Sequence, residues 1–128
     1  MILCEAGAQL GGTLNIAKRA PYMHILGDLI DWHQRQVYKL GVEVRLNTYV
    51  ETDDVLKENP DALIVATGGM TIPDGRQMLV PGELPSGMDQ SHVYDAADVI
   101  LPTLPDLKGK SALVFDDVGR YQAIAAAE

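Results

Sequence analysis

The sequence predicts an α/β fold built on a parallel sheet, and three observations support this prediction. Short apolar or alternating runs that are typical of strands occur at residues 1–4, 42–50 and 61–66. A longer segment, from Tyr22 to Gly41, carries apolar residues at intervals of three and four. A helix therefore separates the first two strands, and this order of elements is typical of α/β proteins.

The first run is expected to be a buried strand that ends at Glu5. Residues 7–21 contain Gly11 and Gly12 but little periodicity, which predicts a loop. The segment that starts at Tyr22 is predicted to be an amphipathic helix, and the glycine that follows its apolar positions is a usual helix stop.

The alternation at 42–50 predicts a half-buried strand, and Thr52 is placed to cap a short helix over residues 53–57. Residues 61–66 form a nearly continuous apolar run, which predicts a central parallel strand buried on both faces. Residues 70–87 hold prolines and glycines without a period, which indicates a connecting segment.

The last part of the chain repeats the strand-turn-helix pattern. Asp95 can cap a short helix that runs through Ile100. A further buried strand is expected at 110–115, then a turn at 116–120 and an Ala-rich helix at 121–128.

Composition excludes several classes of function. The net charge of −8 disfavours nucleic acid and anionic membrane surfaces as partners, because both require clustered Lys and Arg. The single cysteine, Cys4, permits no internal disulfide and is expected to be a small buried residue of a strand, so a cytoplasmic location fits. We expect neither a signal peptide nor a membrane span, and the three histidines lack metal-ligand spacing.

Three places along the chain are candidates for contact with a ligand. Glu5, at a strand end, suits the ribose hydroxyls of a dinucleotide, although an acidic residue can also simply begin a loop. Gly11 and Gly12 would let a backbone approach a pyrophosphate, or form a plain turn. The residues of 66–68, Ala-Thr-Gly, follow a predicted strand, where ligands of open α/β sheets gather.

The order of these pieces is more specific than any one of them. It comprises Glu5 at a strand end, the Gly-Gly-Thr-Leu-Asn of 11–15, a helix ending in Leu-Gly-Val, a strand to Val50, and the Ala-Leu-Ile-Val-Ala-Thr-Gly of 62–68. In this order the sequence resembles, over essentially its whole length, the C-terminal portion of the trimethylamine dehydrogenase and 2,4-dienoyl-CoA reductase family.

The resemblance implies a partial Rossmann-like FAD/NAD(P)-binding fold of the pyridine nucleotide-disulfide oxidoreductase type, truncated at both ends. It implies that residues 1–72 are the C-terminal part of an FAD- or ADP-binding domain, 73–108 a connecting segment, and 109–128 the first strand-turn-helix of a second nucleotide-binding domain. Enzymes of this family carry FMN and an iron–sulfur cluster in a barrel domain, which this chain lacks.

The resemblance also implies a role for each candidate residue. It places Glu5 on the adenosine ribose and the backbone of Gly12 and Thr13 along the cofactor. It places the backbone of Val50 against the adenine edge and residues 66–68 near the pyrophosphate. The implied cofactor-binding set is Glu5, Gly11, Gly12, Thr13, Val50, Ala66, Thr67 and Gly68. None of these residues would make or break bonds, and no catalytic or metal-binding residue is expected, because the flavin carries the redox chemistry.

The implied parent protein is a flavin-dependent oxidoreductase acting on an N-methylated amine, with the missing barrel and an electron-transfer protein as partners. The 128-residue chain alone is expected to be inactive. Alternatives are a 2,4-dienoyl-CoA reductase-like NADH:flavin enzyme, and a non-catalytic ADP-binding or ligand-free remnant. The turn at 116–121 departs from the nicotinamide-binding pattern, because the positions of its three glycines are held by Asp116, Val118 and Tyr121.

Overall fold

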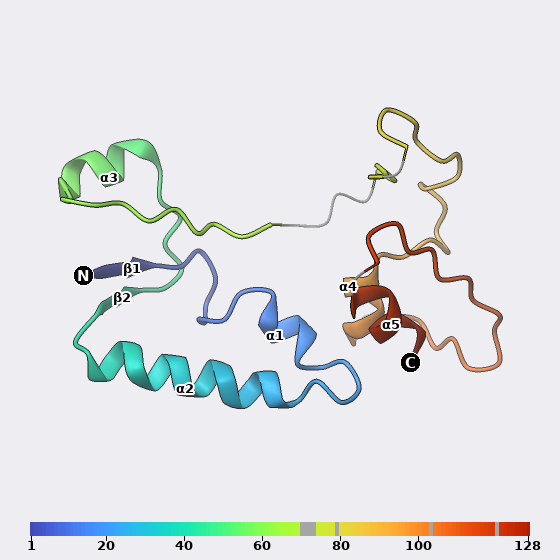
Figure 1. The fold of residues 1–128 in the computed structure, drawn as a ribbon, viewed down its shortest axis with the longest axis horizontal. Coiled ribbons are helices and arrows are strands. Elements are labelled where there is room, and N and C mark those ends of the chain that lie inside the picture. Colours follow the sequence, from blue (N-terminus) through green and yellow to red (C-terminus); the bar gives the residue numbers. More distant parts are fainter. Residues whose placement is uncertain (70–73, 79, 103, 120) are drawn as a thin grey trace. The chain divides into compact units, whose positions relative to one another are not determined.

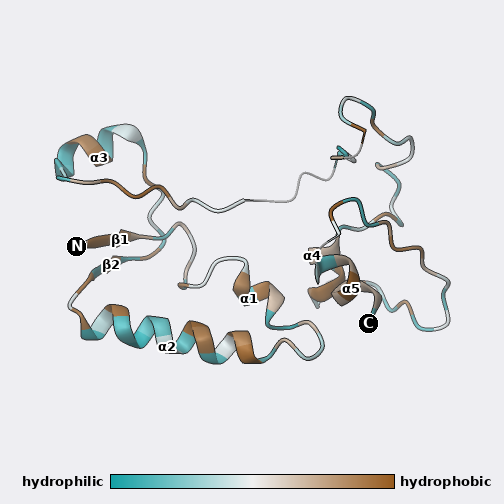
Figure 2. Cartoon of the chain, in the orientation of Figure 1, coloured by the Kyte–Doolittle hydropathy of each residue, from teal (hydrophilic) through white to brown (hydrophobic). Residues whose placement is uncertain are grey.

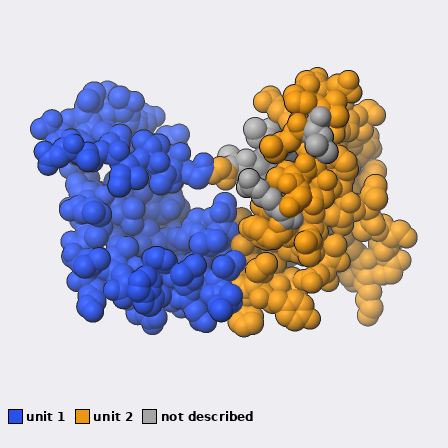
Figure 3. All heavy atoms as spheres, in the orientation of Figure 1, with its two compact units in different colours: residues 1–15, 25–68 blue, residues 16–24, 69–128 orange. Residues whose placement is uncertain are grey.

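The computed structural model describes residues 1–69, 74–78, 80–102, 104–119 and 121–128. These residues form two compact units, one of residues 1–15 and 25–68 and the other of residues 16–24 and 69–128 (Figures 1 and 3). The predicted domain boundary at 72/73 lies outside the described residues. No helix within the described ranges is long and apolar enough to cross a membrane.

A small parallel sheet organises the first unit (Figure 1). Strand β1 (Ile2–Cys4) pairs with β2 (Glu43–Arg45), with Ile2 opposite Glu43. The α/β character and the parallel pairing that the sequence predicts are therefore confirmed. The second strand is shorter than the predicted 42–50, because Asn47 has a φ of 51° that a β ladder does not accommodate.

The predicted amphipathic helix is α2 (Ile25–Lys39), which separates the two strands along the chain. It begins after Tyr22, whose φ of 60° is not helical, and Gly41 follows its end with a φ of 69°. Ile30 is the buried side chain of this helix. The amphipathic helix and the glycine after its end therefore lie where the sequence predicts them.

Helix α3 (Thr52–Glu58) corrects the prediction for Thr52. The cap residue is Glu51, and Thr52 is already the first helical residue. The carboxylate of Asp54 accepts a hydrogen bond from the backbone N–H of Glu51 at 3.1 Å. An acid three residues into the helix therefore satisfies the cap backbone, as in a capping box.

The apolar run at 61–66 is not the buried strand that the sequence predicts. It pairs with no strand of the described chain, and Ile64 and Val65 are 86% and 73% exposed. Figure 2 shows this stretch as an apolar ribbon that follows α3. Its composition favours a strand, but a strand also needs a hydrogen-bonded neighbour, and within the described residues the sheet contains only β1 and β2.

Two short helices pack together in the second unit, α4 (Ala96–Ile100) and α5 (Tyr121–Ala127). Asp95 caps α4 as predicted, since its carboxylate accepts from the N–H groups of Ala97 and Asp98 at 2.5 and 3.2 Å. The strand predicted at 110–115 is absent from the described chain, and Leu113 is 93% exposed. It fails for the same reason as the run at 61–66, since no strand lies beside it.

Candidate functional site

The end of β1 and the chain that follows β2 are joined by backbone hydrogen bonds. The N–H of Glu5 donates to the carbonyl of Arg45 at 2.9 Å, and the carbonyl of Glu5 accepts from the N–H of Thr48 at 2.9 Å. The N–H of Asn47 donates to the carbonyl of Gly7, also at 2.9 Å. This pairing sets Glu5 beside the stretch that leads to Val50.

The carboxylate of Glu5 is held by its own loop. Its Oε1 atom accepts a hydrogen bond of 2.7 Å from the backbone N–H of Gly7. This contact orients the side chain at the carboxyl end of β1, where the sequence placed a ribose-binding acid. A carboxylate accepts several hydrogen bonds, so ribose hydroxyls can still donate to it.

The glycine pair is fixed by side-chain amides. Asn15 Nδ2 and Gln34 Nε2 both donate to the carbonyl of Leu10, at 2.9 and 3.3 Å. Gln34 belongs to α2, so this helix anchors the turn that leads into α1 (Leu14–Ala17). Thr13 lies directly before α1 and is exposed.

Gly11 and Gly12 differ in surroundings, which the sequence did not reveal. A Cβ on Gly11 would lie 2.7 Å from Asn15 Nδ2 and 3.1 Å from Ile30 Cγ2, and the φ of Gly11 is 115°. Gly12 has a φ of 49°, and no atom lies within 4 Å of its Cβ position. Gly11 is therefore needed for packing, whereas Gly12 presents an open backbone.

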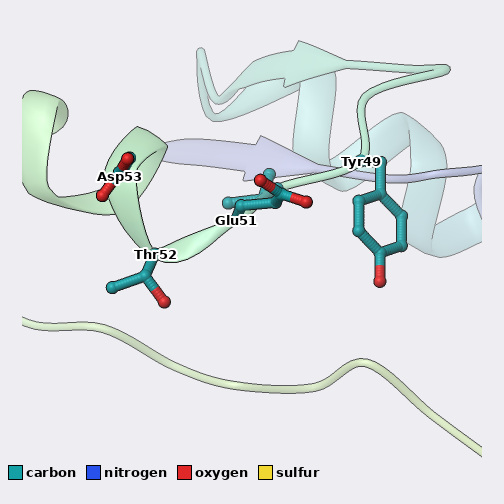
Figure 4. A pocket seen from close by; sticks show the side chains of 5 residues that line it. Tyr49, Glu51, Thr52 and Asp53 are labelled. Atoms are coloured by element: carbon teal, nitrogen blue, oxygen red, sulfur yellow. The ribbon is translucent and has the colours of Figure 1, made fainter.

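An open pocket of about 490 Å³ lies between β2 and α3. Five consecutive residues line it (Figure 4): Tyr49, Val50, Glu51, Thr52 and Asp53. Of these, the sequence singled out only Val50 as a binding residue and considered Thr52 only as a cap. The position of this stretch was a signal that could have identified it, because the stretch connects the end of a strand to the N-terminus of a helix, where ligands of α/β sheets often bind.

The pocket is acidic. Glu51 and Asp53 line it, and Asp54 follows in the same turn of α3. The N–H of Glu51 and the ammonium of Lys57 hold the pKa of Asp54 below its ordinary value. Clustered carboxylates repel phosphate, so this pocket suits an uncharged ring or a sugar better than a phosphate.

Arg45 joins β2 to the end of α3. Its guanidinium contacts Glu43 Oε1 at 2.7 Å and Glu58 Oε1 at 2.6 Å. Hydrogen bonds to Glu58 and then to Glu43 raise the pKa of Arg45. Because two carboxylates already occupy this guanidinium, it is poorly placed to recruit a phosphate.

The remaining candidates of the first unit, Ala66, Thr67 and Gly68, are exposed. Gly68 has a φ of 73°, and no atom lies within 4 Å of its Cβ position. Within the described residues, no hydrogen bond ties these three residues to Glu5 or to the glycine turn. The structure therefore leaves them open to solvent and does not join them to the other candidates.

The turn before α5 is closed by its own acid. Asp116 Oδ1 accepts hydrogen bonds from the N–H groups of Val118 and Gly119, at 3.0 and 2.8 Å. The carboxylate of Asp117 accepts from the N–H of Met78. Arg120, which the sequence also placed in this turn, lies outside the described residues.

Two further observations concern metal and thiol chemistry. The described part of the chain contains no group of three His, Cys, Asp or Glu side chains arranged to hold a metal ion. Cys4 is exposed, which corrects the expectation of a buried thiol. Its strand is paired along one edge with β2 and carries exposed apolar neighbours, Ile2 and Leu3.

Comparison with known proteins identifies relatives but no family model that matches the chain. A protein named probable N-methylproline demethylase, from Rhizobium meliloti, is 34% identical over 100% of this chain and 17% of its own length. The multifunctional alkene reductase/demethylase OYE of Caballeronia cordobensis is 34% identical over 97% of this chain and 16% of its own length. The chain thus spans about a sixth of these relatives.

A solved structure is also similar. The 2-naphthoyl-CoA reductase in complex with 2-naphthoyl-CoA matches 78% of this chain and 14% of its own chain. The TM-score is 0.63 and the sequence identity is 25%. The similarity again covers a small part of a much longer enzyme.

Proposed function

Since the chain is homologous to segments of larger oxidoreductases, we propose that it contributes an adenine-nucleotide half-site, for FAD or ADP, to a flavin-dependent enzyme that oxidises an N-methylated amine. Both curated relatives carry demethylase in their names. The activity then belongs to the whole parent protein, and this chain supplies cofactor binding.

The observation that most supports the half-site is the pairing between Glu5 and the stretch after β2. Because of this pairing, Glu5 and the pocket at Val50 both lie beyond the carboxyl ends of the strands of the same small sheet. Ribose hydroxyls suit a carboxylate, and the acidic pocket suits an uncharged base. The two features therefore match neighbouring parts of one adenosine.

The open backbone of Gly12 fits the next part of such a ligand. A pyrophosphate needs close approach to backbone N–H groups, and no atom surrounds the Cβ position of this glycine. The exposed residues Thr67 and Gly68 are proposed to face the same pyrophosphate. When bound, the flavin supplies the electron transfer, and the residues named here position it.

Two other functions are supported by specific observations. The first is an NADH-dependent reductase, and the word reductase in the names of the alkene reductase/demethylase and the naphthoyl-CoA reductase favours a reductase. A structural ADP site is also compatible with the adenosine contacts, because these contacts do not involve an isoalloxazine ring. The closed turn at Asp116 favours the amine-oxidising enzyme over the NADH-dependent one.

Identification of the bound ligand tests this proposal. The full-length parent protein, released from its non-covalent ligand by gentle denaturation, is expected to yield an adenine nucleotide by mass spectrometry. Visible absorption at flavin wavelengths separates FAD from ADP. A preparation that is fully active with an amine but contains no adenine nucleotide would contradict the half-site.

A further inference from the structure

One wall of the pocket at 49–53 is an aromatic ring that the described protein does not cover. Tyr49 is 79% exposed. Within the described residues, the one close pair of aromatic rings is Trp32 with His33, at 4.9 Å, so Tyr49 stacks on no other ring there. A flat apolar ligand would remove this ring from water and gain free energy from its burial.

The charges of the pocket restrict the kind of ligand that fits. Glu51 and Asp53 lie on the same stretch as Tyr49, and the cation nearby, Lys57, contacts Asp54 at 3.4 Å. Carboxylates repel phosphate but accept hydrogen bonds from amino groups. A neutral ring that carries an amino group is the ligand that these walls suit.

The geometry of the backbone connects this ring to the acid at the end of β1. Thr48, which precedes Tyr49, donates its N–H to the carbonyl of Glu5 at 2.9 Å. Figure 4 shows the Tyr49 and Thr52 side chains extending to the same side of this stretch. This bond brings the backbone before Tyr49 next to that of Glu5, so a nucleoside whose ribose meets Glu5 can extend its base toward Tyr49.

We propose that Tyr49 stacks on the adenine base of the half-site. The inference rests on the proposed adenine-nucleotide function. It assigns the contact with the base to the ring of Tyr49 and not to its hydroxyl group. Stacking is tolerant of the identity of the ring, so phenylalanine can replace the tyrosine. The neighbouring carboxylates favour a base with an amino group.

The test uses the full-length parent protein, stripped of its nucleotide and titrated with ADP by calorimetry. Tyr49→Ala is expected to weaken binding on the order of ten-fold, the effect of losing one stacked ring. Tyr49→Phe is expected to bind ADP like the wild type. Tyr38→Ala, which removes another exposed ring from the same unit, serves as the matched control and leaves the affinity unchanged.

The outcomes distinguish this inference from the proposed function. A wild-type protein that does not bind ADP overturns the proposed half-site itself. A wild-type protein that binds ADP, together with a Tyr49→Ala variant of equal affinity, overturns only the stacking. Loss of affinity in Tyr49→Phe overturns it as well, because the hydroxyl would then be the binding group.

A measurement on the wild-type protein alone tests the inference even if Tyr49→Ala does not fold. ADP and ribose 5-diphosphate, which lacks only the base, are compared as ligands of the stripped protein. A base bound on Tyr49 requires ADP to bind more tightly than ribose 5-diphosphate. Equal affinities would show that the base contributes nothing and would overturn the inference.

Discussion

The backbone N–H of Thr48 donates a hydrogen bond of 2.9 Å to the carbonyl of Glu5. The bond continues the parallel pairing of β1 and β2 beyond the last residues of both strands. It joins two features that are far apart in the sequence, an acid at a strand end and a pocket at a helix start. This pairing sets the positions of both features of the proposed adenosine site.

Replacement of Glu5 tests the ribose contact. Glu5→Ala in the full-length protein is expected to weaken adenine-nucleotide binding by about 1.5–3 kcal/mol, the range for a hydrogen bond to a charged group. Calorimetry on the nucleotide-free protein measures the change. Glu83→Ala, an exposed acid of the other unit, is the control and should have no effect. An unchanged affinity of Glu5→Ala would reduce Glu5 to a loop residue.

Substitutions of the two glycines of the turn are expected to differ in their effect on stability. Gly11→Ala should lower the thermal unfolding temperature more than Gly12→Ala, because its Cβ displaces the Asn15 amide from its bond to the Leu10 carbonyl. Gly12→Ala adopts a left-handed conformation at a cost of roughly 1–2 kcal/mol and has free space around it. Circular dichroism measures both unfolding temperatures.

Gly12→Asn distinguishes a loss of nucleotide binding from a loss of stability, which Gly12→Ala alone does not. Asparagine tolerates the left-handed conformation, so the variant should fold nearly as well as the wild type. Its side chain nevertheless enters the open side of the turn, where we propose that the pyrophosphate binds. Nucleotide affinity in the full-length protein should therefore fall while stability is retained. Unchanged affinity would argue that the turn is structural only.

The success of sequence-based prediction depended on the range of the interactions involved. The helix at Ile25–Lys39 and the cap at Asp95 were predicted well, because their signals are local. The run at 61–66 was predicted to be a buried strand, yet Ile64 is 86% exposed. Pairing and burial of a strand depend on distant segments, and composition reports only the capacity for them.

For the candidate site, too, local features were predicted from the sequence, whereas contacts between distant residues were not. Glu5 and Val50 were selected from the sequence, and the structure adds the hydrogen bonds that bring their segments together. The different surroundings of Gly11 and Gly12 could not be read from a Gly-Gly pair, since they depend on Ile30 of α2. The role that we propose for Tyr49 was also not predicted, because an aromatic residue near a strand end is equally typical of a core.

The start of α3 should respond to acid. The Glu51 N–H and the Lys57 ammonium depress the pKa of Asp54 in the folded chain, so its ionised form stabilises the helix start. This contribution is present above the unfolded pKa, about 3.9, and is lost as the pH falls through the lower folded value. An NMR titration of the Asp54 carboxyl group should give a midpoint below that of an unstructured aspartate.

Lys57→Gln provides the matched variant for this titration. It removes the contact of 3.4 Å between the ammonium and Asp54 Oδ1 but leaves the Glu51 N–H in place. The midpoint of Asp54 should rise part of the way toward the unstructured value. An identical midpoint in both proteins would mean that the Lys57 ammonium does not influence the carboxylate in solution.

The hydrogen bonds of the turn at 116–119 argue against nicotinamide binding here in the proposed parent enzyme. A phosphate at the turn before a helix binds through free backbone N–H groups, yet those of Val118 and Gly119 already donate to Asp116 Oδ1. We therefore expect that neither NADH nor NADPH reduces the flavin of the full-length enzyme through this turn. An N-methylated amine should reduce it, with a protein or a second flavin as the acceptor.

Anaerobic addition of each reductant to the oxidised full-length protein, followed by flavin absorbance, provides the measurement. Bleaching by an amine alone supports the amine-oxidising enzyme. Rapid, saturable bleaching at micromolar nicotinamide would refute the expectation and support the reductase. Asp116→Asn serves as the matched variant: it removes the negative charge but keeps an oxygen that can accept from both N–H groups. If occupation of these groups excludes the phosphate, Asp116→Asn should remain unreactive with NADH, whereas Asp116→Gly should gain weak reactivity. An equal gain of reactivity in both variants over the wild type would show that charge repulsion, and not the hydrogen bonds, closes the turn.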